Sequence, residues 1–326
     1  MILSLPQYEQ EIQVAIAAVQ AAAQLCEAVR RDRESQPMAK ADNSPVTVAD
    51  FGSQALICEA LRAAFPHDAI IAEEDGGLLQ QKAQSGVLER ILQYIRQQIP
   101  QATASKVIDW IDQGNGEIAP RYWTLDPIDG TKGFLRGDQY AIALALIEEG
   151  KVKIGILGCP ALPHSDGTTG VLFMAQQGKG ATQAQLNGCN PQFLQVRQVA
   201  DTSQLQVIES IESAHSDRDR QKAVAAVLGM TQLPQLMDSQ AKYGVVASGD
   251  AGFYLRIPPP EAGDRKENIW DHAAGSLLVT EAGGKVTDLA GNSLDFSHSL
   301  QLNENYGICA SQGQFHAEIL AAVASA

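Results

Sequence analysis

The sequence predicts an α/β protein in two parts, an α+β domain over residues 1–200 and an α/β domain over residues 201–326. Three observations lead to this prediction. The 326 residues suffice for two ordinary domains, each with its own core. Helical periodicity in the first half of the chain gives way to paired strand patterns. After about residue 200, strand and helix patterns alternate, as is typical of α/β units.

The first two predicted elements are helices. Apolar residues at helical spacing predict a helix from about residue 7 to residue 30, followed by a polar loop over residues 31–43. Thr47 is placed to cap a second helix, which should end before Pro66. Asp50 then falls in the first turn of that helix, facing a loop.

Strand patterns follow, and two of them deliver acidic residues. Residues 69–72 form a short apolar strand that runs into Glu73-Glu74-Asp75, and a later strand from Tyr122 delivers Asp126. A helix from Leu88 to Ile99 lies between them. Two hairpins are predicted beyond Tyr140, by residues 141–147 with 152–157 and by residues 170–180. The first half should therefore be helices packed against an antiparallel sheet.

The second half shows a mixed pattern without an internal repeat or a low-complexity linker. Its predicted strands are residues 205–208, 244–247 and 252–257. Its predicted helices are residues 218–228, 271–281 and 315–323. This alternation is the basis for the second domain.

Composition narrows the function classes. The formal net charge of −14 argues against binding to nucleic acid or anionic membranes, because both require a surplus of lysine and arginine. No basic residue precedes Arg30 to suggest a targeting segment, and we find no apolar run suited to span a bilayer. The five cysteines are scattered, which favours free thiols. We expect a cytoplasmic protein without an obligatory protein partner.

The segment from Trp123 to Gly137 is the most informative part of the chain. Asp126 and Asp129 lie three positions apart, with Pro127 stiffening the link between them. Gly130 permits close approach of the backbone, and Thr131 offers a hydroxyl at a helix start, where free amides bind phosphate. An isolated Asp-x-x-Asp is usually a solvated turn, but this combination indicates a phosphate site served by Mg²⁺.

Two further acidic points support a metal site. Glu73, Glu74 and Asp75 taken alone would be a solvated turn, but beside the Asp126 segment they indicate metal ligands. Asp271 at a helix start would by itself complement the helix dipole. His272 taken alone is better interpreted as a structural histidine than as a general base. The haloacid-dehalogenase spacing, with aspartates two positions apart, does not match, so chemistry through a phosphoaspartate is disfavoured.

Taken together, these segments resemble the motifs of the inositol monophosphatase superfamily. Within it the chain is most similar to the 3'(2'),5'-bisphosphate nucleotidases, because the motif Asp126-Pro-Ile-Asp-Gly-Thr is extended by Lys-Gly-Phe-Leu-Arg-Gly. The other matching motifs are residues 44–50, 239–243 and 269–275. Ala72 departs from the pattern, since many relatives have glycine before the Glu-Glu pair. The match runs from about residue 44 to residue 287 and implies a layered α-β-α-β-α sandwich.

The resemblance also implies roles for individual residues. Two or three Mg²⁺ ions would be held by Glu73, Asp126, the Ile128 carbonyl, Asp129 and Asp271. The attacking water would be activated by Asp50 and Thr131, without a covalent enzyme intermediate. Substrate contacts would come from Gly130, Thr131, His215, Ser239, Lys242, Arg256 and Asp271. Lys242 and Arg256 are the cations expected to bind the 5'-phosphate, although Arg256 alone would be an exposed strand residue.

Several functions compete at this stage. The implied reaction is Mg²⁺-dependent, lithium-sensitive hydrolysis of 3'-phosphoadenosine 5'-phosphate to 5'-AMP, with 3'-phosphoadenylyl sulfate as a further substrate. An inositol monophosphate, inositol polyphosphate or fructose 1,6-bisphosphate phosphatase would use the same chemistry, but residues 132–137 and the Ser239/Lys242 segment count against it. A catalytically silent module that binds nucleotide or metal is disfavoured because every acidic position and Thr131 are present.

Overall fold

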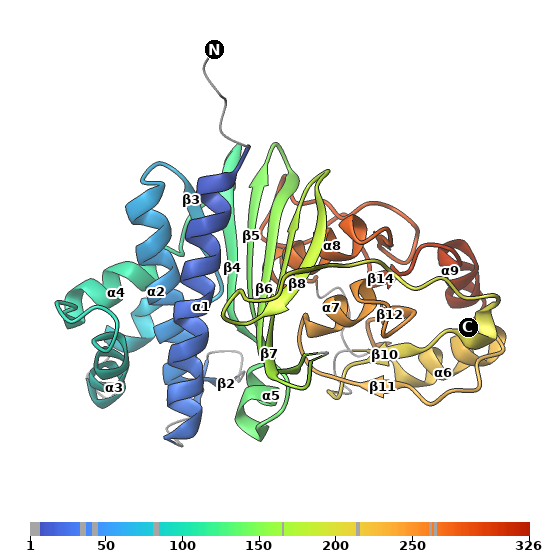
Figure 1. Cartoon of the computed structure of the whole chain (residues 1–326), viewed down its shortest axis with the longest axis horizontal. Helices are drawn as coiled ribbons and strands as arrows, with labels where there is room; N and C mark the ends of the chain where they lie inside the picture. Colours follow the sequence, from blue (N-terminus) through green and yellow to red (C-terminus); the bar gives the residue numbers. More distant parts are fainter. Residues whose placement is uncertain are drawn as a thin grey trace, which may run out of the picture.

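A computed structural model describes residues 7–32, 37–40, 45–80, 85–164, 166–212, 216–260, 263 and 266–326. Figure 1 shows two sheets separated and flanked by helices. The first sheet contains β3 (Ala69–Ala72), β4 (Arg121–Asp129), β5 (Ala141–Glu148), β6 (Lys151–Pro163), β7 (Thr169–Gln176), β8 (Gly180–Gln185) and β9 (Gln192–Phe193), in that order. The second has the order β11 (Gln235–Leu236), β10 (Val207–Glu209), β12 (Phe253–Arg256), β14 (Ile308–Ser311) and β13 (Lys285–Thr287).

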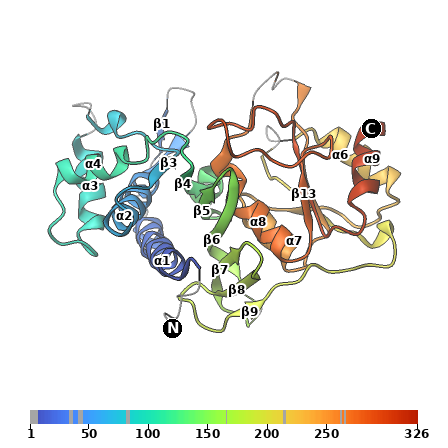
Figure 2. The ribbon, with the colours of Figure 1, turned by 90° about the horizontal axis from the view of Figure 1, so that it is seen from above.

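The helices form three layers around these sheets. The first layer comprises α1 (Glu9–Arg31), α2 (Val48–Ala64), α3 (Ser85–Ile95) and α4 (Ala104–Asp112). The layer between the sheets comprises α7 (Ala241–Ala247) and α8 (Ala273–Glu281), and the outer layer comprises α6 (Arg218–Val227) and α9 (His316–Ser325). This arrangement is visible from above in Figure 2. The predicted α-β-α-β-α sandwich is therefore confirmed.

Three apolar cores correspond to these layers, and strand β5 shows why. Along β5, Ile142 and Leu144 point into the core beneath α1 and α2, whereas Ala143 and Ala145 point into the core shared with α7 and α8. Successive side chains of a strand face opposite sides of the sheet, so a strand buried on both faces is apolar throughout. The third core lies between the second sheet and helices α6 and α9.

The local start of α2 is as predicted from the sequence. The side chain of Thr47 accepts a hydrogen bond from the Ala49 amide at 3.1 Å, and the Asp50 carboxylate accepts one from the Thr47 amide at 2.8 Å. This capping box satisfies amides that a helix start leaves without partners. The helix ends at Ala64, before Pro66.

Several predictions of local structure were wrong. Residues 244–247 form part of helix α7 rather than a strand, because a short, wholly apolar run buried between two sheets carries no helical periodicity. The first sheet is not purely antiparallel, since β3 pairs with β4 in parallel. Ile99 lies outside α3, and neither α4 nor β14 was predicted from the sequence.

Helix α1 also corrects an expectation. Within the described ranges it is the one helix long and apolar enough to cross a membrane, judged by length and composition. Its apolar surface is used for packing, because Ala15, Val19, Cys26 and Val29 are fully buried against α2 and the first sheet. The predicted boundary at residue 200 falls between β9 and β10, and the division into two domains stays a prediction. The five cysteines are free thiols, as expected.

Candidate active site

Three carboxylates from distant parts of the chain meet at one point. Asp126 and Asp129 come from the end of β4, and Asp271 comes from a 3₁₀ turn (Ile269–Asp271) just before α8. Each offers an oxygen, and these oxygens all lie within 4.8 Å of one another. Asp126 is 2% exposed. The sequence motifs thus converge in space, although Asp271 lies 142 positions after Asp129 in the chain (271 − 129).

The backbone of β4 is adapted to present these acids. The pairing of β4 with β5 shifts register between Asp126 and Asp129, which marks a bulge. Such a bulge redirects side chains that a regular strand would place on opposite faces. One Asp126 oxygen accepts a hydrogen bond from the Ile128 amide at 3.1 Å, which fixes the turn.

Gly130 joins this bulge to the short helix α5 (Thr131–Arg136). Its φ angle of 87° lies in the left-handed region that favours glycine, and a Cβ there would stand 3.0 Å from the Cβ of Ser239. Ser239 itself has a φ of 67°. The next residue, Gln240, donates its amide to the Asp129 carboxylate at 2.5 Å. The Ser239 segment is therefore packed directly against the end of β4 and Gly130.

Asp50 and Thr131 form a pair beside the acids. The Thr131 hydroxyl lies 3.2 Å from the Asp50 carboxylate and 3.2 Å from the Ile128 carbonyl, so its single proton can be donated to either. Burial raises the pKa of Asp50 to about 6, opposed by hydrogen bonds from Thr47. This predicted pair is thus in direct contact.

Glu73 lies at the edge of the cluster. Its carboxylate and that of Glu74 both accept from the Lys40 ammonium, at 2.7 and 2.6 Å. Burial raises the pKa of Asp126 well above its ordinary range, and the neighbouring charges of Glu73, Asp129 and Asp271 raise it further. Lys40 was not predicted as a site residue, because a lone lysine beside a polar loop gives no signal of its partner.

The carboxylates of the cluster are buried close together, so their negative charges need a compensating cation. Burial followed by the charge of Asp129 raises the pKa of Asp271, and burial also raises that of Asp129. Like charges brought together away from water disfavour ionisation unless a cation compensates them. The three donors are all carboxylate oxygens, the ligand type that a hard divalent cation such as Mg²⁺ prefers. The chemistry of the donor set therefore fits such a cation.

The predicted phosphate-binding cations lie near the acids, and both already have partners. Lys242 is 4% exposed, and its ammonium donates to the Ser239 carbonyl at 2.8 Å. Arg256 forms an ion pair with Glu267 at 2.7 Å. Both cations lower the pKa of Asp129, so they lie near the acids. Arg256 is thus not the exposed strand residue that its local pattern alone suggested, and its partner Glu267 was missed.

The remaining predictions concern two histidines, His215 and His272. His215 lies outside the described residues. His272 is buried, and its Nδ1 contacts the Tyr243 hydroxyl at 2.8 Å. Burial lowers the pKa of His272, so the ring is neutral near pH 7. These contacts favour the structural interpretation of His272.

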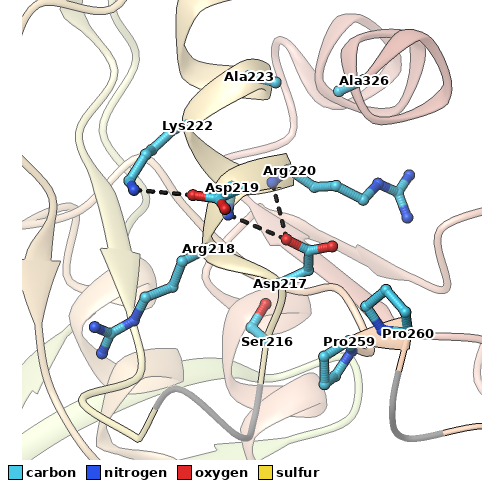
Figure 3. A pocket seen from close by; sticks show the side chains of 10 residues that line it. All are labelled: Ser216, Asp217, Arg218, Asp219, Arg220, Lys222, Ala223, Pro259, Pro260 and Ala326. Atoms are coloured by element: carbon cyan, nitrogen blue, oxygen red, sulfur yellow. Dashed lines mark hydrogen bonds and ion pairs between the residues drawn. The ribbon is translucent and has the colours of Figure 1, made fainter.

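A separate cavity of about 690 Å³ lies at the start of α6, and none of the predicted site residues that the structure describes lines it (Figure 3). Asp217 accepts hydrogen bonds from the amides of Asp219 and Arg220 at 3.1 and 3.0 Å, so the helix start is already capped. Lys222 pairs with Asp219 at 3.0 Å. Local partners thus satisfy much of the charge around this cavity, and we assign it no function.

One sequence model of a protein family matches almost the whole chain. It is that of the inositol monophosphatase family, and it matches residues 7–326. The chain belongs to the inositol monophosphatase family. A protein of Oryza sativa named 3'(2'),5'-bisphosphate nucleotidase is 44% identical over 98% of this chain and 95% of its own length. A protein of Emericella nidulans with the same name is 40% identical over 97% of this chain and 98% of its own. The resemblance found in the sequence motifs is confirmed.

Solved structures agree on the fold. An inositol monophosphatase of Thermotoga maritima superposes with a TM-score of 0.67 at 22% identity, covering 97% of both chains. An inositol monophosphatase of Anabaena (Nostoc) sp. gives a TM-score of 0.64 at 20% identity, covering 98% of this chain and 97% of its own. At these identities the likeness speaks for the fold alone.

Proposed function

We propose that this member of the inositol monophosphatase family is a Mg²⁺-dependent, lithium-sensitive 3'(2'),5'-bisphosphate nucleotidase. It hydrolyses 3'-phosphoadenosine 5'-phosphate to 5'-AMP and phosphate, and also takes 3'-phosphoadenylyl sulfate. The observation that carries the proposal is the position of Lys242 and Arg256 beside the acid cluster. Two phosphates then have two separate binding environments, one acidic and metal-dependent and one basic.

The acids Glu73, Asp126, Asp129 and Asp271, together with the Ile128 carbonyl, would hold two or three Mg²⁺ ions. When bound, Mg²⁺ neutralises phosphate charge and lowers the pKa of a coordinated water. Asp126 and Asp129 are fixed for this role by amide hydrogen bonds from Ile128 and Gln240.

Asp50 and Thr131 would accept the proton of the attacking water. The Thr131 hydroxyl donates to Asp50, which leaves the lone pairs of its oxygen free to accept from water. The water oxygen forms a bond to phosphorus while the bond from phosphorus to the 3'-oxygen breaks. The departing 3'-oxygen takes a proton from solvent water and becomes the 3'-hydroxyl of 5'-AMP, and the proton accepted by Asp50 returns to solvent. Buried Asp50, with a pKa of about 6, is poised to act as this base near neutral pH.

Gly130 and Ser239 would contact the substrate between the binding sites of its two phosphates. The absence of a side chain at Gly130 lets α5 approach Ser239 closely. Lys242, held by the Ser239 carbonyl, and Arg256 would face the 5'-phosphate. We assign His215 a minor contact with the nucleotide, a role that rests on the family resemblance alone.

A phosphate-release assay tests this function. The panel contains 3'-phosphoadenosine 5'-phosphate, 3'-phosphoadenylyl sulfate, inositol 1-phosphate, inositol 1,4-bisphosphate and fructose 1,6-bisphosphate, each with and without Mg²⁺. We expect the adenosine bisphosphate to be cleaved fastest, only with Mg²⁺, and to be inhibited by millimolar lithium but not by potassium at equal ionic strength. A preference for inositol 1-phosphate would remove the nucleotidase assignment, and no release from any compound would favour a silent binding module.

A further inference from the structure

We propose that Glu267 is a positioning residue that aims Arg256 at the 5'-phosphate and thereby determines specificity for nucleotide bisphosphates. This inference rests on the proposed function and adds a residue to it. Glu267 lies four positions before Asp271, outside the motif that the sequence analysis recognised.

The contact between the two side chains is bidentate. Arg256 Nε donates to Glu267 Oε1 at 2.8 Å, and Arg256 Nη2 donates to Glu267 Oε2 at 2.7 Å. Both side chains are largely buried, at 18% and 16% exposure. Two parallel charge-assisted hydrogen bonds fix the plane and direction of a guanidinium group, which a single contact cannot do.

Arg256 needs such a restraint because a competing anion stands close by. Asp271 offers an oxygen within 4.8 Å of a Glu267 oxygen, and it belongs to the metal cluster. The charge of Arg256 acts on the pKa of both Asp271 and Asp129. An arginine freed from Glu267 would be drawn to these acids. Glu267 therefore holds the cation away from the metal ligands and available to a substrate anion.

Glu267 is itself well anchored. Its backbone carbonyl accepts from the Leu302 amide at 2.9 Å, and His272 Nε2 lies 3.5 Å from its Oε2. His272 is held in turn by Tyr243 through its other ring nitrogen. The backbone hydrogen bond from Leu302 and the bidentate contact with Arg256 keep the carboxylate in place before substrate arrives, which is what a positioning residue requires.

An alternative role for Glu267 is ligation of a metal together with Asp271 and His272. Both Glu267 oxygens already accept from the Arg256 cation, and a second cation at the same carboxylate would be repelled by the first. The contacts therefore favour positioning over metal binding. The experiment below separates the two.

The test is a double-mutant cycle of Arg256→Ala and Glu267→Gln. For each variant, kcat/KM is measured on 3'-phosphoadenosine 5'-phosphate and on 3'-AMP, which lacks the 5'-phosphate. Binding of Mn²⁺ is measured by titration without substrate. Glu11→Gln is the matched control, because Glu11 is a similarly buried partner of another arginine, Arg121, at 2.9 Å. Thermal unfolding verifies that each variant is folded.

Glu267→Gln should reduce the preference for the bisphosphate over 3'-AMP about tenfold, mainly through KM, while Glu11→Gln leaves it unchanged. In the Arg256→Ala background, Glu267→Gln should change this preference no further, because its effect acts through Arg256. An undiminished preference in Glu267→Gln, or additive losses in the double variant, would overturn the inference. If Glu267→Gln weakens Mn²⁺ binding in the Arg256→Ala background, Glu267 is a metal ligand instead. If Arg256→Ala itself leaves the preference intact, the proposed 5'-phosphate site is wrong, which is a distinguishable result.

Discussion

The two ends of the candidate site differ in how their charges are compensated. At the acidic end, Asp126, Asp129 and Asp271 crowd together, and burial and mutual repulsion raise the pKa of Asp126 and Asp271. At the basic end, Arg256 is already paired with Glu267. Burial raises the pKa of Glu267, but Arg256 and His272 together outweigh this effect and lower the pKa to about 2. The acidic end therefore depends on added cations for its charge balance, whereas the basic end is organised by the protein alone.

The largest expected effect breaks the acidic end. Asp129→Asn should abolish Mg²⁺-dependent turnover, because a neutral amide of similar shape cannot replace a charged ligand. The fold should survive, since repulsion among the remaining acids falls. Turnover is measured by phosphate release, with Asp109→Asn on the exposed face of α4 as the matched control. Activity of Asp129→Asn within about tenfold of the parent would refute its role as a metal ligand.

The next effect concerns the pair beside the acids. Thr131→Val keeps the shape of the side chain but removes the hydroxyl that contacts Asp50. We expect kcat to fall by about 10²–10⁴-fold with little change in KM, as for loss of a general-base pathway. Thr131→Ser restores the hydroxyl and should keep much of the rate. Steady-state kinetics of the parent and of both variants measure these changes. An unchanged kcat in Thr131→Val would show that the role of Thr131 is structural.

A smaller effect is expected at the basic end. Arg256→Ala should lower kcat/KM for 3'-phosphoadenosine 5'-phosphate about ten- to a hundredfold more than for 3'-AMP, the range of a lost charge-assisted contact. Arg62→Ala, an exposed arginine near the end of α2, serves as the control. Equal losses on the two substrates would show that Arg256 does not contact the 5'-phosphate.

The smallest effect is on stability. Groups whose pKa is raised by folding, such as Asp50 at about 6, stabilise the protein below their unfolded pKa, and this contribution is lost as pH rises through the folded pKa. As pH rises from about 4 to 7, the metal-free protein should therefore become less stable, because the carboxylates at the acidic end of the site ionise. Mg²⁺ binds the folded state and the ionised acids, so it should raise Tm by a few degrees more at pH 7.5 than at pH 5. Thermal unfolding in Mg²⁺ and in EDTA measures this difference. An equal gain at both pH values would contradict the account.

The sequence predicted more of the acidic end than of the basic end, for a physical reason. Asp126, Asp129 and Thr131 lie on one short segment, so their proximity is set by local geometry, and the capping of α2 by Thr47 and Asp50 is equally local. The Arg256–Glu267 pair depends on how the end of β12 packs beside the turn before α8, which no local pattern encodes. The same limitation explains why α7 was predicted as a strand, since burial between two sheets removes the polar face that marks a helix.

The most direct test of the account is the identity of the phosphate that is released. Phosphorus NMR of 3'-phosphoadenosine 5'-phosphate, incubated with the enzyme and Mg²⁺, distinguishes the two possible products. We expect 5'-AMP and inorganic phosphate alone, because the acidic end processes the 3'-phosphate while the basic end retains the 5'-phosphate, and we expect no reaction in EDTA. Formation of 3'-AMP, or release that continues without metal, would contradict the division of the site into these two ends.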